Sequence, residues 1–432
     1  MAEMRFASSR GNAPLASLSQ AIEQGLAPDG GLYIPTRLPR IDSLPQTAPL
    51  PHIARLSLAA FFDGDRLQPL LGEIADAALA INAPTTPVAA CRDPLFALEL
   101  FHGPTAAFKD FGARFLAESL QRLEAARGQP LTILVATSGD TGGAVAAAFH
   151  RRSWARVVIL YPKGLVSPRQ EQQLTCWGDN VLALRIDGTF DDCQRLVKDA
   201  FGDPTLSLEH RFSSANSINI GRLLPQMVYY IASSLDVARR TGMNPSYIIP
   251  AGNLGNALAA VWARALGFPM ARIILAHNIN RTVPDFLQTG RWQPRPSIPT
   301  LASAMDVGNP SNMERIRSLY PSWDAIREQL SADSIDDATI RSRIGGDFMQ
   351  YGREWCPHTA TAAEVYGRLS AAERRDHPWV LVATAHPAKF NDIVEPIIGK
   401  PVAVPESLAR LLSLTPHRID MPPTLEALAA VL

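Results

Sequence analysis

The sequence has few of the features that mark specialised classes of protein. It has four cysteines, Cys91, Cys176, Cys193 and Cys356, in no CxxC spacing, so we expect neither a disulfide framework nor a zinc site. Cys356 lies close to His358, but two possible ligands do not make a metal site. No stretch is long and apolar enough to cross a bilayer, and the N-terminus has no apolar signal segment. We therefore expect a cytoplasmic protein without membrane association.

The sequence also lacks net charge. Lys plus Arg and Asp plus Glu both number 41, whereas nucleic-acid-binding chains usually carry a basic excess. We therefore expect no nucleic-acid partner, although a local positive pocket is compatible with this balance. Hydrophobic residues make up 47% and charged residues 19%, proportions typical of a packed globular protein. A chain of 432 residues usually divides into several domains.

Residues 1–90 differ in pattern from the rest of the chain. Turn clusters such as the one at Pro28 interrupt them, and the proline-rich stretch 41–52 is predicted to be a loop. Helical periodicity follows at 53–62 and at 67–81. We therefore predict a separate N-terminal domain over residues 1–90.

Apolar runs and helical segments alternate in the remainder of the chain. Strands are predicted at 131–136, 157–161, 181–186, 247–250, 272–276 and 379–384, and helices at 144–150, 168–177, 190–201, 223–235 and 257–266. Apolar strands separated by helices are typical of a parallel sheet covered on both faces, so we predict an α/β fold. Ligands of such sheets bind outside the carboxyl ends of the strands. Two domains are predicted, a smaller one at 91–215 and a larger one at 216–432.

One lysine stands at the start of a predicted amphipathic helix. The segment 102–111 opens this helix, with Pro104 in its first turn, and Lys109 follows Phe108 beside the apolar stripe. Apolar surroundings disfavour a protonated amine, and a neutral amine can form a Schiff base with an aldehyde. The alternative is a surface lysine paired with Asp110, and this segment alone favours that alternative.

A glycine-containing turn, Gly252-Asn-Leu-Gly-Asn256, lies between a predicted strand and a predicted helix. Its glycines allow several N–H groups to converge, and the helix start presents a positive end to an anion, so a phosphate monoester fits. The pattern differs from the dinucleotide G-x-G-x-x-G, so a nicotinamide cofactor is a weak alternative. An ordinary strand-to-helix turn explains it equally well.

The loop Thr137-Ser-Gly-Asp-Thr-Gly-Gly143 has the same setting and offers hydroxyl and backbone donors to an anion. Asp140 does not suit a pure anion site, but it could accept a hydrogen bond from a hydroxyl or imine. Simple helix capping by Ser138 or Thr141 is the alternative.

A third polar cluster, at 213–222, precedes an apolar helix. Arg222 can bind a phosphate through two N–H groups, and Ser217 and Asn219 can donate to the same group. Simple capping is again the alternative. A second anion site is needed if the substrate carries its own phosphate.

Together these segments resemble the threonine synthase family, within the fold-type II enzymes that use pyridoxal phosphate (PLP). The matching stretches are 21–35, 102–112, 136–142, 214–219, 252–256 and 384–390. The resemblance covers nearly the whole chain. It implies a tryptophan synthase β-like fold with two parallel-sheet domains and an N-terminal extension. It also implies a lyase, a monomer or homodimer, that converts O-phospho-L-homoserine and water to L-threonine and phosphate, the last step of threonine biosynthesis.

The resemblance further implies a role for each site residue. Lys109, next to Phe108, would bond covalently to PLP, Asp140 would face its phenolic oxygen, and Thr384 would hydrogen-bond its pyridine nitrogen. The remaining implied ligands are Gly252, Asn253, Leu254, Gly255 and Asn256 for the PLP phosphate, Thr137, Ser138 and Thr141 for the substrate carboxylate, and Ser217, Asn219 and Arg222 for the substrate phosphate. Close relatives often have phenylalanine and aspartate where this turn has Leu254 and Asn256, changes that a backbone-built site tolerates.

Two other functions use the same residues. A PLP-dependent dehydratase or phospholyase would make 2-oxobutyrate from threonine or phosphohomoserine. The polar cluster at 213–222 argues against threonine as its substrate, because threonine has no phosphate to bind. A binding or regulatory protein on a degenerate PLP fold is the second alternative, and the presence of Lys109 argues against it.

Overall fold

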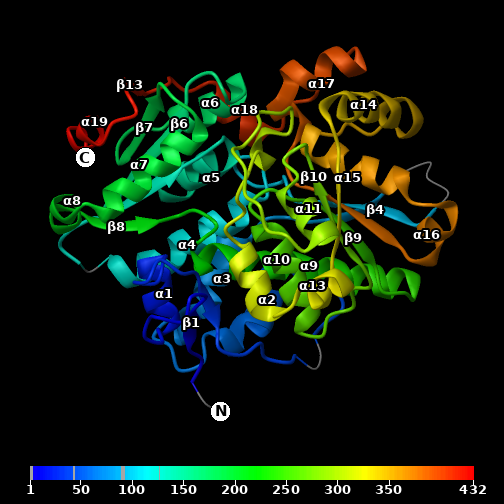
Figure 1. The fold of residues 1–432 in the computed structure, drawn as a ribbon, viewed down its shortest axis with the longest axis horizontal. Helices are drawn as coiled ribbons and strands as arrows, with labels where there is room; N and C mark the ends of the chain where they lie inside the picture. Colours follow the sequence, from blue (N-terminus) through cyan, green and yellow to red (C-terminus); the bar gives the residue numbers. More distant parts are fainter. Residues whose placement is uncertain (1–2, 42–43, 89–92, 126) are drawn as a thin grey trace.

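The computed structural model describes residues 3–41, 44–88, 93–125 and 127–432. It contains two large sheets with helices around them and a small two-stranded sheet (Figure 1). The six-stranded sheet has the order β11 (Ser331–Ser334), β10 (Ile273–His277), β9 (Ser246–Pro250), β12 (Trp379–Ala383), β4 (Leu95–Glu99), β3 (Thr85–Pro87). The five-stranded sheet has the order β13 (Ile419–Met421), β7 (Val181–Ile186), β6 (Ala155–Pro162), β5 (Leu131–Ala136), β8 (Arg211–Ser214). All pairings in these two sheets are parallel except that of β3 with β4, so the predicted α/β fold is confirmed.

Helices cover both sheets and the N-terminal part. The helices of the first half are α1 (Leu18–Gln24), α2 (Leu50–Leu58), α3 (Leu71–Leu79), α4 (Lys109–Glu124), α5 (Asp140–Phe149), α6 (Pro168–Thr175), α7 (Phe190–Gly202) and α8 (Pro204–Glu209). Those of the second half are α9 (Ile220–Thr241), α10 (Gly255–Ala265), α11 (Thr282–Thr289), α12 (Met313–Leu319), α13 (Trp323–Gln329), α14 (Asp337–Tyr351), α15 (Pro357–Arg368), α16 (Ala371–Asp376), α17 (Asn391–Ile398), α18 (Glu406–Leu412) and α19 (Leu425–Ala429). Short 3₁₀ turns are η1 (Ala59–Phe61), η2 (Gln68–Leu70), η3 (Ser303–Met305) and η4 (Pro387–Phe390). Within the ranges described above, no helix is long and apolar enough to span a membrane.

The N-terminal part packs onto the central helices of the molecule. Strands β1 (Phe6–Ser8) and β2 (Tyr33–Pro35) form a two-stranded antiparallel sheet. Helix α3 contacts α4, and α2 contacts α9, so their apolar residues join one core with those central helices. The boundary predicted at residues 90 and 91 lies outside the described residues, as does Cys91.

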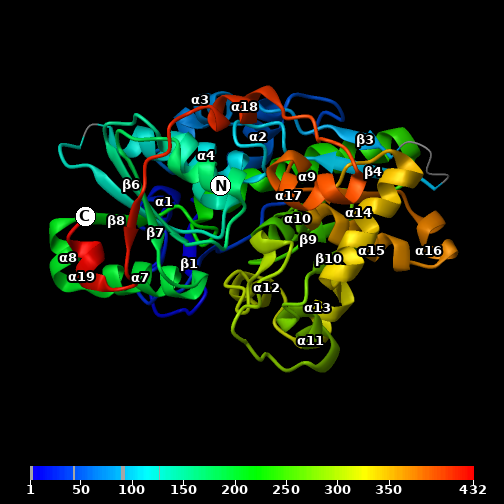
Figure 2. The same ribbon diagram turned by 90° about the horizontal axis from the view of Figure 1, so that it is seen from above.

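The two sheets are not contiguous in sequence. Strand β4, early in the chain, pairs with β12 in the six-stranded sheet. After α17 and α18 the chain crosses to the five-stranded sheet, where β13 pairs with β7 (Figure 2). The division into domains at 91–215 and 216–432 therefore stays a prediction. The sheets do not follow it, because β4 lies in the first range but joins the six-stranded sheet, and β13 lies in the second range but joins the five-stranded sheet.

The helix predicted to open at Pro104 begins instead at Lys109. The Asp110 carboxylate accepts hydrogen bonds from Thr105 N at 2.9 Å and Thr105 Oγ1 at 2.7 Å, which closes a turn before the helix. Ala106 within this turn has φ +54°, a conformation that a helix does not contain. Lys109 is thus the first residue of α4, where its side chain can face the strand ends.

Candidate active site

A cavity lies where the loops after β5, β9 and β12 meet the start of α4. Every site residue predicted from the sequence lines it except Asn219; Asn216, Gln226, Met305 and His358 also line it. These loops follow the carboxyl ends of parallel strands, the end at which such sheets bind ligands. The cavity therefore draws on both sheets.

Lys109 is held in largely apolar surroundings. Its Nζ lies 4.5 Å from the centre of the Phe108 ring. Burial and, to a smaller extent, the Arg222 charge lower the pKa of the amine to about 8, although the Asp140 charge opposes them. About one amine in ten would then be neutral at pH 7. The alternative of a surface lysine paired with Asp110 is wrong, because the Asp110 carboxylate binds Thr105 instead.

The turn at 252–256 forms a tight backbone site at the start of α10. A Cβ at Gly252 would lie 2.8 Å from Met305 Cα, so a side chain there would force the two loops apart. Leu254 adopts φ +62°, in the left-handed region, and Gly255 is the first residue of α10. Unpaired N–H groups at a helix start suit a phosphate.

Two asparagine side chains of this turn are anchored to neighbouring elements. Asn253 Nδ2 donates to Ser217 Oγ at 2.8 Å, so these amide and hydroxyl groups bind each other. Asn256 Oδ1 accepts from the hydroxyls of Tyr229 at 2.6 Å and Tyr230 at 3.0 Å. Asn256 Nδ2 is buried without a partner in the described part of the chain, which leaves a donor beside the turn.

Arg222 is a buried guanidinium that lines the cavity from the start of α9. Its Nη1 donates to the carbonyl of Ala215, while Nε is buried and has no partner among the described residues. Burial lowers the pKa of Arg222 to about 10. A Cβ at Gly112 would lie 2.9 Å from Nε and 2.6 Å from the carbonyl oxygen of Arg222. Helix α4 can therefore approach α9 this closely only because residue 112 is glycine. An unpartnered buried donor on a cationic group is suited to binding an anion.

The prediction that Asn219 binds substrate phosphate is wrong for this structure. Its Oδ1 accepts from Gly221 N at 2.9 Å and caps α9, while Nδ2 donates to the carbonyls of Ile22 and Ser214 at 2.9 and 3.0 Å. All its polar atoms are used away from the cavity, as the capping alternative required. Ser217 does line the cavity.

The loop after β5 divides its hydroxyls between two tasks. Thr137 Oγ1 accepts from Gly139 N at 3.0 Å and Gly142 N at 2.9 Å, so it holds the loop in shape. Ser138 and Thr141 line the cavity, and within the described residues their hydroxyls bind no other protein group. They remain available for a ligand.

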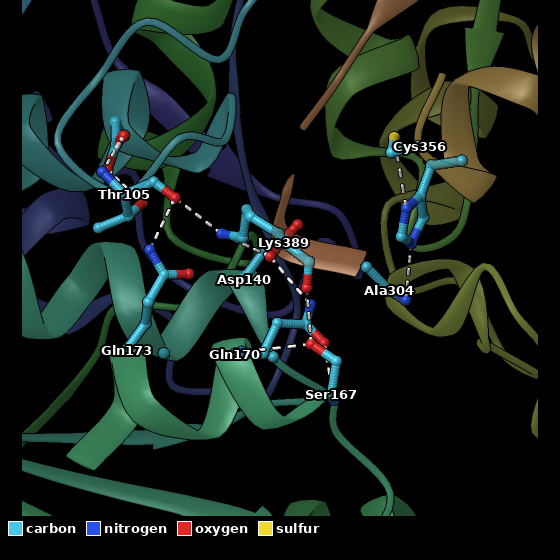
Figure 3. A network of polar contacts seen from close by, with 12 residues as sticks. Thr105, Asp140, Ser167, Gln170, Gln173, Ala304, Cys356 and Lys389 are labelled. Carbon is cyan, nitrogen blue, oxygen red and sulfur yellow. Dashed lines mark hydrogen bonds and ion pairs between the residues drawn. The ribbon is translucent and has the colours of Figure 1, made fainter. Parts of the chain in front are cut away.

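Asp140 is paired with a lysine that the sequence analysis did not single out. Lys389 Nζ lies 2.8 Å from Asp140 Oδ1, and Gln170 Nε2 donates to the same oxygen at 3.0 Å (Figure 3). Lys389 lies in a stretch that carried the family resemblance, but nothing local in the sequence identifies so distant a partner.

His358 lines the cavity, although the sequence analysis considered it only as a possible metal ligand. Its Nε2 accepts a hydrogen bond from Ala304 N at 3.1 Å (Figure 3), and burial lowers its pKa to about 4, so the ring is neutral. Cys356 Sγ lies 3.9 Å from Nδ1 of this ring. No group of three potential metal ligands occurs in the described residues, and a Cys–His metal site was not expected.

These residues fit a phosphorylated aldehyde such as PLP. The Lys109 amine lines the same cavity as the turn at 252–256. This turn has no room for a side chain at residue 252. The unpaired Nδ2 of Asn256 and the N–H groups of the α10 start supply donors for a phosphate. Thr384, whose carbonyl accepts from Phe108 N at 2.8 Å, lines the same cavity.

Comparisons with known proteins agree with this chemistry. A family model described as "Pyridoxal-phosphate dependent enzyme" matches residues 82–384, and together with the parallel sheets it makes the chain a fold-type II PLP enzyme. Two further models, "Threonine synthase N terminus" and "Threonine synthase, C-terminal", match residues 5–67 and 359–432. The chain belongs to the threonine synthase family, whose members are PLP-dependent lyases.

Individual relatives extend the match over nearly the whole chain. A threonine synthase of Escherichia coli is 40% identical over 410 residues, which cover 94% of this chain and 92% of the relative. A crystal structure of threonine synthase from Escherichia coli has a TM-score of 0.90 and 38% identity, covering 99% of both chains. The structure of PLP-bound threonine synthase from Brucella melitensis has a TM-score of 0.89 and 32% identity, covering 99% of this chain and 98% of that one. The predicted family, fold type and cofactor are thus confirmed.

Proposed function

We propose that the substrate is O-phospho-L-homoserine, which the chain converts with water to L-threonine and phosphate. The observation that carries this proposal is Arg222, a buried guanidinium that lines the same cavity as Lys109 and the turn at 252–256. The cavity therefore has a second place for an anion, in addition to the turn suited to the cofactor phosphate. A substrate with its own phosphate accounts for both.

The cofactor-binding roles are assigned as follows. Lys109 would bond covalently to PLP beside Phe108, and the backbone of Gly252–Asn256 would hold its phosphate with Asn256 Nδ2 as a further donor. Asp140 would bind the phenolic oxygen and Thr384 the pyridine nitrogen. Bound PLP supplies a conjugated ring that accepts the electron pair left on Cα when its proton is removed.

The substrate is held at its two charged ends. Ser138 and Thr141 donate to the carboxylate, in a loop whose shape Thr137 maintains. Arg222 binds the phosphate, with Ser217 beside it. Because these contacts fix both ends of a short chain, the Cα–H is held in one orientation.

Lys109 moves the protons of the reaction. Its Nζ would take the Cα proton of the bound substrate and then transfer protons to and from neighbouring carbons. A pKa near 8 lets the same amine act as base and as acid close to neutral pH. Arg222 stabilises the γ-phosphate as it leaves, and the departing phosphate is placed to accept a proton from the water that adds at Cβ.

A product assay tests the proposal. Purified chain with PLP is incubated with O-phospho-L-homoserine, and phosphate, threonine and 2-oxobutyrate are measured. Equal release of phosphate and threonine supports it. Phosphate with 2-oxobutyrate would make the chain a phospholyase, and no visible absorbance after PLP addition would favour the non-catalytic alternative.

The cellular setting stays a proposal as well. We propose a cytoplasmic enzyme, monomeric or homodimeric, that acts on a small molecule. Cell fractionation and analytical ultracentrifugation test these two properties.

A further inference from the structure

The ion pair between Asp140 and Lys389 connects the two halves of the site. Both side chains are almost fully buried, with 4% and 1% exposure. A lysine is rarely buried so completely, because removing an ammonium from water is costly without a counter-charge. Asp140 opens α5 after β5 of the five-stranded sheet, and Lys389 lies in η4 after β12 of the six-stranded sheet. The pair therefore bridges the carboxyl ends of strands from both sheets.

The ammonium of Lys389 is held in one position from several sides. Its Nζ donates to the carbonyl of Thr105 at 2.8 Å, and Gln173 Nε2 donates to the same carbonyl at 3.0 Å (Figure 3). The main chain of Lys389 is anchored too, because Ser167 Oγ donates to its carbonyl at 2.9 Å. Such a fixed ammonium can define both the charge and the direction of the carboxylate it contacts.

Asp140 presents its two oxygens to different surroundings. Oδ1 accepts from Lys389 and Gln170, whereas no hydrogen bond to Oδ2 occurs in the part of the chain that the structure describes. Asp140 and Lys109 line the same cavity. Burial raises the pKa of Asp140, but the Lys389 charge, His358 and Gln170 together bring it below its ordinary value.

The other titratable groups around the pair are few. Lys109, His358 and Cys356 interact electrostatically with Asp140. Asp110, His358 and His386 interact with Lys389. Arg222 and Asp140 shift the pKa of Lys109, and Lys389 forms an ion pair with Asp140, so Lys389 acts on Lys109 through Asp140.

We propose that Lys389 is a positioning residue that keeps the Asp140 carboxylate charged and directed at the cavity, and thereby sets the proton affinity of the Lys109 nitrogen. This inference rests on the proposed role of Lys109 as the lysine that bonds to the cofactor. The proton affinity of that nitrogen decides how readily it takes and returns protons. Lys389, which follows a strand of the six-stranded sheet, would thus control the charge of Asp140, which follows a strand of the five-stranded sheet.

The test measures the titration of Lys109 in the full chain prepared without cofactor. Competitive labelling with acetic anhydride over a range of pH, read by mass spectrometry, gives the midpoint for Lys109, expected near the pKa of about 8. Asp140→Asn should lower this midpoint by about one unit, because an opposite charge near the amine is lost. Lys389→Met should lower it by a similar amount, because the buried Asp140 carboxylate takes up a proton when its counter-charge is removed. The double variant should give the same midpoint as Asp140→Asn alone. Lys400→Met is the matched control, since Lys400 pairs with Glu354 at 49% exposure, and it should leave the midpoint unchanged.

Two results would overturn the proposal. One is a wild-type midpoint in Lys389→Met; the other is a double variant whose midpoint differs from that of Asp140→Asn. If Lys389→Met does not fold, because Asp140 is left buried without its partner, the double variant has no carboxylate there, and its comparison with Asp140→Asn decides.

Failure of the proposed function would be seen separately. Borohydride reduction after PLP addition shows by mass spectrometry whether wild-type Lys109 carries the cofactor. The midpoints are obtained without PLP, so they test the influence of Lys389 on Lys109 whether or not the cofactor bonds there.

Discussion

The Gly112→Ala substitution tests how the position of Arg222 is set. The added Cβ would lie 2.6 Å from the carbonyl oxygen and 2.9 Å from Nε of Arg222, contacts that real Cβ atoms essentially never make. The carbonyl belongs to the backbone of α9, so α4 and α9 must separate or the guanidinium must turn. We expect the Arg222 side chain to move by about 0.5–1 Å, because its own backbone is one of the atoms displaced.

The magnitude follows from two opposing effects. Overpacking of this kind costs about 1–3 kcal/mol, whereas alanine inside a helix is favoured over glycine by about 1 kcal/mol. The fold should therefore lose at most about 2 kcal/mol. A displacement of about 1 Å in a positioning group can lower turnover by about 100-fold. We expect kcat/KM for O-phospho-L-homoserine to fall about 10- to 100-fold while PLP binding stays within about twofold.

Steady-state kinetics, PLP titration and urea denaturation measure these three effects on one preparation. Gly346→Ala is the matched control, because nothing lies within 4 Å of a Cβ built at that helical glycine. It should gain about 0.5–1 kcal/mol of stability and keep wild-type kinetics. Wild-type kcat/KM in Gly112→Ala would refute the argument that the missing Cβ at residue 112 positions the guanidinium.

Four further results are expected. Lys109→Ala should abolish the visible absorbance of bound PLP and turnover, and a variant that kept both would remove the assignment. Arg222→Met should lower kcat/KM for O-phospho-L-homoserine by about 10- to 100-fold, from the loss of charged hydrogen bonds, with PLP titration unchanged. Gly252→Ala should weaken PLP binding at least about tenfold in an equilibrium titration, since its Cβ would lie 2.8 Å from Met305 Cα. Without cofactor, burial in the folded chain lowers the Lys109 pKa from 10.5 to about 8. Between pH 8 and pH 10.5 the unfolded chain therefore binds more protons than the folded chain. The unfolding free energy of wild type relative to Lys109→Met should therefore rise by about 3 kcal/mol between pH 8 and pH 10.5, and a difference independent of pH would contradict the lowered pKa.

The buried strands were the most predictable part of the fold. Strands β5 and β7 have the bounds predicted from the sequence, and β6, β9, β10 and β12 differ by one or two residues at an end. A strand buried on both faces must be apolar throughout, and this leaves a local signal. Strands β3, β8, β11 and β13 were not predicted, because short runs at a sheet edge carry no comparable pattern. Strand β4 was also missed, although it is buried and as long as β9.

The polar residues likewise divide into those whose role the sequence predicted and those whose role it did not. The motifs at Lys109, at the loop after β5 and at the turn after β9 were recognised, and the structure brings them to one cavity. Asn219 was misassigned, because an asparagine before a helix reads the same whether it caps the helix or binds a ligand. One of its three hydrogen bonds, to the carbonyl of Ile22, depends on where the N-terminal part packs.

The sequence by itself determined the family, the cofactor class and the identity of the buried strands, because these depend on short stretches of neighbouring residues. Tertiary structure alone decided which polar side chains meet across the site. It placed Lys389 on Asp140, directed Arg222 at the cavity through the missing side chain of Gly112, and turned Asn219 away. Electrostatic energy depends on distance in space and on exclusion of water, and neither is a property of adjacent residues in a chain.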